Sequence, residues 1–91
     1  MGAVAKAIKD KLSAAFSPTR LEVDDDSARH HGHAGAREGG ESHFNVVIET
    51  PQFEGLGRVQ RQRAVLSVLS AELAGPVHAL SIKARAPGEP E

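Results

Sequence analysis

The order of three segments in the middle of the chain constrains its fold more than any other feature. Residues 43–50 alternate apolar and polar side chains, residues 58–74 have a helical spacing of apolar side chains, and residues 77–84 are strand-like again. Two strands of one sheet that are joined by a helix run parallel, through a right-handed crossover. The sequence therefore predicts a sheet in which the strands at 43–50 and 77–84 point the same way.

A helix and a further strand precede that unit. Residues 3–16 place an apolar side chain at every fourth position, which marks the buried face of an amphipathic helix. These side chains are Val4, Ile8, Leu12 and Phe16. Pro18 ends the helix, and Leu21 and Val23 then alternate with polar residues as in a half-buried strand. Because a loop joins this strand to the one at 43–50, we expect the two to pair antiparallel.

The helix expected at 58–74 offers the core a stripe of apolar side chains. The stripe consists of Val59, Leu66, Leu69 and Leu73, widened by Val65 and Val68. Phe53 is expected to fold back into the core, and Gly75-Pro76 to end the helix. The chain is thus predicted to be one α+β domain with the order α-β-β-α-β and a three-stranded mixed sheet. We place this domain at residues 1–86, followed by a flexible, proline-rich tail at 87–91.

The composition indicates a small soluble domain and excludes several other classes. The 91 residues carry a formal net charge of −1, and no apolar run is long enough to span a bilayer. The N-terminus lacks the apolar core of a signal peptide, so we expect a cytoplasmic protein without a membrane partner. We also expect the isolated chain to be a monomer or a weak dimer. Neither a Ser/His/Asp or Cys/His set nor a glycine motif for phosphate is present, so we do not expect an enzyme.

The predicted strand directions bring all the histidines of the chain to one end of the sheet. Three of them lie in the glycine-rich loop at 27–41, one begins the strand at 43–50, and one lies in the strand at 77–84. They are His30, His31, His33, His43 and His78. The chain has no cysteine, so it can offer imidazole nitrogen but no thiolate to a metal. A soft-metal centre at this end would therefore need sulfur from another molecule.

Each of these histidines also has an ordinary structural interpretation. His78 shares the parity of the core residues Leu80 and Ile82, where a histidine is usually a partly buried polar group. His33 lies in a glycine-rich loop, where a histidine is usually a polar surface residue, and His43 could merely donate a hydrogen bond to the loop backbone. The pattern by itself leaves both interpretations open.

Five short segments occur in a specific order along the chain. They are Glu41-Ser-His-Phe-Asn-Val-Val-Ile48, Phe53-Glu-Gly-Leu56, Gln60-Arg-Gln-Arg63, Ala71-Glu-Leu73 and Pro76-Val-His-Ala-Leu-Ser-Ile82. Together with the opening helix before Pro18-Thr-Arg-Leu-Glu-Val23, they resemble the BolA-like proteins over about residues 4–84. The resemblance implies a fold similar to the type II KH domain.

The same resemblance implies a partner and a shared cofactor. BolA-like proteins pair with monothiol glutaredoxins and share a bridging [2Fe-2S] cluster, for which the glutaredoxin side supplies its active-site cysteine and a glutathione thiol. The ligands that the resemblance assigns to this chain are His78 and a loop histidine. His33 fits the loop position by its sequence context, with His30 and His31 as alternatives. No cluster is expected in the isolated chain.

A basic segment supports an alternative function. Arg58, Arg61 and Arg63 lie at the start of the helix at 58–74, where positive charge opposes the helix dipole, so local helix stability does not explain them. They are either a solvated helix start or a surface for a partner protein, glutathione carboxylates or DNA. Family members are also described as transcription regulators, which keeps DNA binding as the alternative. The lack of a Gly-x-x-Gly clamp and of stacking aromatics argues against it.

Overall fold

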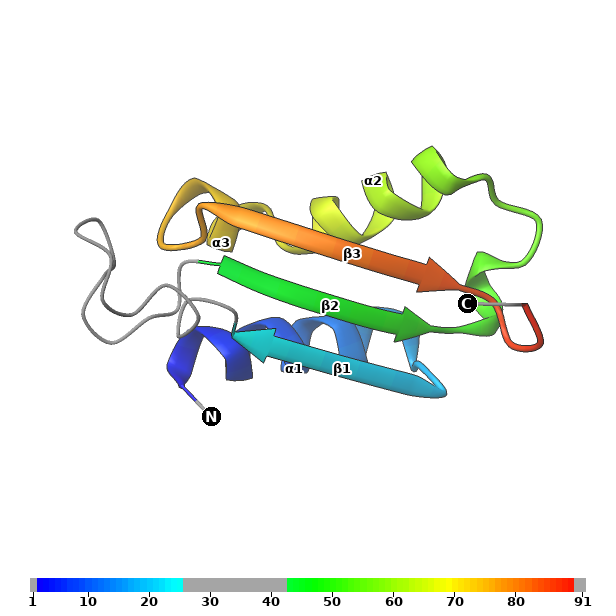
Figure 1. Ribbon diagram of the computed structural model, residues 1–91, viewed down its shortest axis with the longest axis horizontal. Coiled ribbons are helices and arrows are strands. Elements are labelled where there is room, and N and C mark those ends of the chain that lie inside the picture. The colour runs from blue at the N-terminus through cyan, green and yellow to red at the C-terminus, as the bar shows by residue number, and fades with distance from the viewer. Residues whose placement is uncertain (1, 26–42, 90–91) are drawn as a thin grey trace.

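The computed structural model describes residues 2–25 and 43–89. Its elements are, in order, α1 (Ala3–Phe16), β1 (Arg20–Asp25), β2 (His43–Glu49), the 3-10 helix η2 (Pro51–Phe53), α2 (Arg58–Val68), α3 (Ser70–Ala74) and β3 (Ala79–Arg85). The strands of this described part form one sheet in the order β1-β2-β3. The helices contribute to one apolar core with the sheet, which leaves the opposite face of the sheet open, toward the viewer in Figure 1.

The strand directions agree with those predicted. β1 pairs antiparallel with β2, and β2 pairs parallel with β3 after the crossover through α2 and α3. Within β2, buried and half-buried residues alternate as the sequence pattern requires, with Phe44, Val46 and Ile48 facing the core. The predicted fold class, an α+β domain with a three-stranded mixed sheet, is confirmed.

The core joins the first helix to the middle strand and to the turn after it. On α1 the buried residues are Ala5, Ile8, Leu12 and Phe16, almost the stripe predicted. Phe53 has no exposed surface, as predicted, and packs against the Phe16 ring at a centroid distance of 5.3 Å. The buried Thr50 hydroxyl donates a hydrogen bond of 2.8 Å to the Phe16 carbonyl. The end of β2 is therefore tied to the end of α1.

In the second half of the chain, the predicted helix is divided, and the face that it turns to the core differs from the one predicted. The single helix expected at 58–74 is divided at Leu69 into α2 and α3. Val59 is 61% exposed and Leu66 is 36% exposed, although both were expected in the core. They are seven residues apart and so share one helix face, which lies about 100° from the face of Val65. Of the predicted stripe, Val65 and Leu69 are fully buried in the core, as expected.

The third strand begins later than predicted, and this changes the position of His78. β3 starts at Ala79 rather than at residue 77. The Val77 amide donates a hydrogen bond to the Glu72 carbonyl at 3.0 Å, so this residue closes the end of α3 and its side chain is buried. His78 therefore lies just before the strand and is exposed, not on the core side with Leu80. None of the helices in the described residues is long and apolar enough to cross a membrane.

Candidate functional site

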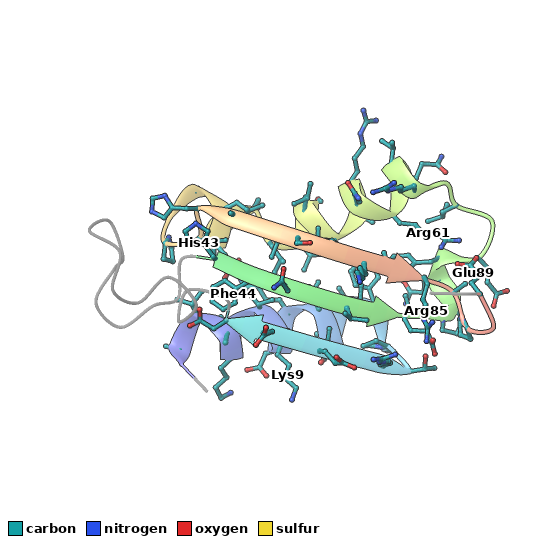
Figure 2. All side chains as sticks on the ribbon, viewed as in Figure 1. Lys9, His43, Phe44, Arg61, Arg85 and Glu89 are labelled. Carbon is teal, nitrogen blue, oxygen red and sulfur yellow. The ribbon has the colours of Figure 1, made fainter. Side chains whose placement is uncertain are left out.

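Two histidines lie at the same end of the sheet because β2 and β3 run parallel. His43 is the first residue of β2 and pairs with Ala79, the residue directly after His78. Figure 2 shows His43 at this end. β1 finishes at the same end, where Asp25 pairs with Phe44. The predicted gathering is confirmed for these two histidines, and three others lie outside the described residues, namely His30, His31 and His33.

His78 presents an accessible imidazole on a fixed backbone. Its side chain is exposed, and within residues 2–25 and 43–89 it has no hydrogen-bond or ion-pair partner. The residue before it is anchored by its buried side chain, and the residue after it is held in the sheet. An imidazole held in this way can bind a group outside the chain without a large loss of backbone entropy.

His43 borders an open hollow on the uncovered face of the sheet. The hollow has a volume of about 260 Å³ and runs between the starts of β2 and β3, along Asn45, Ala79 and Ser81. His43 is half-buried and already interacts with neighbouring groups. Because Ala79 and Ser81 carry small side chains, another molecule can approach the start of β3 closely.

The chemistry of these donors fits one side of a metal centre. In the described part of the chain no group of three or more His, Asp or Glu side chains could hold a metal ion, and the whole sequence has no cysteine. Imidazole replaces thiolate on one iron of some [2Fe-2S] clusters. His78 therefore fits such a cluster as a single nitrogen ligand, and the described residues do not form a complete site.

The three arginines of the predicted basic segment do not share one exposed surface. Arg61 is only 12% exposed, and its guanidinium donates hydrogen bonds of 2.6 and 2.8 Å to the two carboxylate oxygens of Glu89. Its Nε also donates to the Leu56 carbonyl at 2.9 Å, and the guanidinium lies 5.9 Å from the centre of the Phe53 ring. Figure 2 labels Arg61 and Glu89 at the end of the sheet opposite His43. Arg61 is thus occupied within the chain, contrary to its predicted place on an exposed binding surface.

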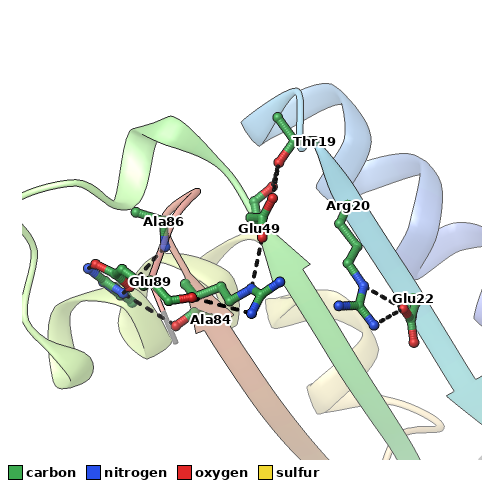
Figure 3. A network of polar contacts seen from close by, with 9 residues as sticks. Thr19, Arg20, Glu22, Glu49, Ala84, Ala86 and Glu89 are labelled. Atoms are coloured by element: carbon green, nitrogen blue, oxygen red, sulfur yellow. Dashed lines mark hydrogen bonds and ion pairs between the residues drawn. The ribbon is translucent and has the colours of Figure 1, made fainter. Parts of the chain in front are cut away.

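Glu89 links the segment after β3 to α2; we call its contacts with Arg61 and Ala86 the Arg61–Glu89 contact. Its carboxylate also accepts a hydrogen bond of 3.0 Å from the Ala86 amide, which Figure 3 shows. The hydrogen bonds from Arg61, and next the one from Ala86, lower the pKa of Glu89 to about 2. The same contact raises the pKa of Arg61. The sequence pattern assigned residues 87–91 to a flexible tail, and Glu89 is a partner that it does not predict.

The helix phase explains why Arg61 turns inward. Arg61 and Val65 on α2 and Leu69 at its C-cap follow one another at four-residue spacing and so lie on one face, the face that packs on the core. This spacing is visible in the sequence and could have identified Arg61 as partly buried. Arg58 and Arg63 lie off this face and are exposed.

These features define the class of the protein: a small α+β domain with one mixed three-stranded sheet and an exposed histidine immediately before the last strand. The family model described as BolA-like protein matches residues 12–89, and the chain belongs to this family. It is 47% identical to BolA-like protein 1 of Bos taurus over 98% of its own length and 63% of that protein's. With human BolA-like protein 1 the identity is 46%, over 98% of this chain and 62% of that one. The chain thus spans less than two thirds of these curated relatives.

Solved structures of relatives have the same fold. The BolA domain of SufE1 from Arabidopsis thaliana aligns with a TM-score of 0.86 and 39% identity, over 99% of both chains. The solution structure of BolA1 from Mus musculus aligns with a TM-score of 0.80 and 44% identity, over 96% of this chain and 68% of that one. The agreement covers the sheet and the helices that position His78.

Proposed function

We propose that this chain is a non-enzymatic, cytoplasmic partner of a monothiol glutaredoxin, and that the two proteins share a bridging [2Fe-2S] cluster in iron–sulfur or iron handling or sensing. Family membership supports this proposal. The observation that carries it is the exposed imidazole of His78, which has no partner in the described part of the chain and lies at the end of the sheet where the strand starts meet.

In this proposal, His78 and His33 are the ligands that the chain contributes. A bound cluster would supply an exchangeable iron–sulfur unit, and the thiolates of the glutaredoxin and of glutathione would complete its coordination. The backbone on both sides of His78 is held in place, which supports a role for this imidazole as a pre-positioned ligand. Imidazole binds metal only in its neutral form, so proton competition weakens nitrogen ligation as the pH falls. A cluster held in this way is easier to release than one held by four thiolates.

Co-expression with a monothiol glutaredoxin tests the proposal. The purified complex, with glutathione present, should show the visible absorbance and circular dichroism of a [2Fe-2S] cluster. Pulsed electron paramagnetic resonance of the reduced cluster should detect strongly coupled imidazole nitrogen, and His78→Ala should alter or abolish that signal, because the loop histidine would then be the one nitrogen ligand left from this chain. His43→Ala is the matched control, since it deletes the neighbouring imidazole, and it should retain the signal. A complex that forms without a cluster, or a nitrogen signal unchanged in His78→Ala, would contradict the proposal.

The alternative, a DNA-binding transcription regulator that uses Arg58, Arg61 and Arg63, receives less support. Arg61 is bound to Glu89, so two of the three arginines remain exposed. Binding of DNA through a row of phosphate contacts would decrease steeply with salt, with a log–log slope of roughly −0.9 per phosphate neutralised. We expect weak, salt-sensitive binding, and tight binding to one sequence would favour the regulator instead.

A further inference from the structure

A second candidate site lies at the end of the sheet opposite His43 and His78. There a cleft of about 460 Å³, here called the basic cleft, is lined by four cationic residues together with Gln62 and apolar residues. The cations are Arg20, Arg58, Lys83 and Arg85, and the apolar lining residues are Val47, Ile82 and Ala84. No Asp or Glu is among the described residues that line it. Since the whole chain has a net charge of −1, this grouping does not reflect a general excess of positive charge.

The topology brings these cations together from three elements. Lys83 and Arg85 are two residues apart on β3 and so face the same side of the sheet. Arg20 on β1 and Arg85 on β3 both pair with Glu49, which lies between them on β2. Arg58 is the first residue of α2. Figure 2 labels Arg85 at this end of the sheet and His43 at the other.

Two of the four cations are held by acidic neighbours. The Arg20 Nε donates a hydrogen bond of 2.6 Å to Glu22, and the Arg85 Nε lies 2.8 Å from a Glu49 carboxylate oxygen. These ion pairs appear as dashed lines in Figure 3. They hold the two guanidinium groups beside the cleft.

The other two cations remain uncompensated. The side chains of Arg58 and Lys83 are exposed, and neither has a hydrogen-bond or ion-pair partner within residues 2–25 and 43–89. Like charges that line a concave surface repel one another and raise the local concentration of anions. An anion that bound between them would relieve this repulsion.

We propose that the basic cleft binds a small phosphate-bearing molecule, of the kind that carries a diphosphate or triphosphate group. The cleft volume falls within the range of about 300–1,000 Å³ that is typical of small-molecule sites. Guanidinium and ammonium groups donate charge-assisted hydrogen bonds to phosphate oxygens, and arginine does so through two bonds at once. The two uncompensated cations match a multiply charged group better than a single carboxylate. Val47, which lies beside Lys83 on the open face of the sheet, offers an apolar contact to the rest of the molecule.

Calorimetric titration of the 91-residue chain with pyrophosphate and with ATP, at roughly 0.15 M salt, tests this site. Both ligands should bind with a stoichiometry of one. Amide chemical-shift changes should group at residues 82–85 and at the start of α2. Lys83→Gln and Arg58→Gln should each weaken binding about fivefold or more, since each removes one charge-assisted contact.

Arg63→Gln is the matched control, because it removes the same charge from an exposed arginine on the same helix that does not line the cleft. This variant should bind within about twofold of the unmodified chain. An equal loss in Arg63→Gln would mean a general charge effect, and the absence of saturable binding would overturn the proposal directly. Tighter binding of a short DNA duplex than of ATP, with shifts reaching Arg63, would assign the surface to nucleic acid instead. Because the cleft lies far along the sheet from His78, this result does not depend on the cluster proposal.

Discussion

A matched pair of substitutions, Val65→Ala and Val59→Ala, tests which face of α2 packs against the core. Both remove the same two methyl groups from the same helix. Val65 has no exposed surface, whereas Val59 is 61% exposed. The apolar pattern of the sequence places both residues in the core, so the pair separates the structure from the sequence-based prediction.

The expected cost follows from the burial of each side chain. Removing two buried methyl groups loses about 0.8 kcal/mol of transfer free energy for each, and the cavity left behind adds to this. Val65→Ala should therefore lower the free energy of unfolding by about 2 kcal/mol. Val59→Ala should change it by less than about 0.5 kcal/mol, and a slight gain is possible because alanine favours the helix more than valine does.

Urea denaturation followed by circular dichroism measures this difference. A domain of this size has a total stability of roughly 5–10 kcal/mol, so the Val65→Ala midpoint should move to a clearly lower urea concentration. In thermal unfolding the same loss should lower Tm by about 8–16 °C. Equal effects of the two substitutions, or a larger effect of Val59→Ala, would show that the helix presents a different face to the core.

Three further predictions concern the chain end and the histidines. The lowered pKa of Glu89 means that its contribution to stability is present above about pH 4.5 and is lost as the pH falls toward about 2. The unfolding midpoints of the unmodified chain and of Glu89→Gln should therefore differ at pH 7 and converge in acid. A difference between the two midpoints that did not change with pH would contradict a stabilising Arg61–Glu89 contact. The isolated chain should be colourless after iron–sulfur reconstitution and become coloured only with glutaredoxin and glutathione, whereas a stable [2Fe-2S] spectrum from this chain alone would contradict the shared site. In that complex His33→Ala should weaken the cluster more than His30→Ala or His31→Ala, without unfolding the domain, and equal effects would mean an interchangeable loop ligand.

The fold class could be predicted from the sequence because its signals are local. Alternating side chains mark a strand, four-residue spacing marks a helix, and a helix between two strands of one sheet makes them parallel. These rules together place His43 and His78 at one end of the sheet, and the structure confirms it. The lack of cysteine is likewise a property of the sequence alone, and it limits the chain to nitrogen ligands for a soft metal.

Contacts between segments far apart in the chain depended on the tertiary structure. The apolar pattern of α2 is broad enough to allow several phases, and packing on the sheet selected the face of Arg61 and Val65. That choice turned Arg61 inward, where it meets Glu89, a residue 28 positions later that no local pattern connects to it. The basic cleft has the same origin, since its cations come from separate elements that only the assembled sheet and helix bring together.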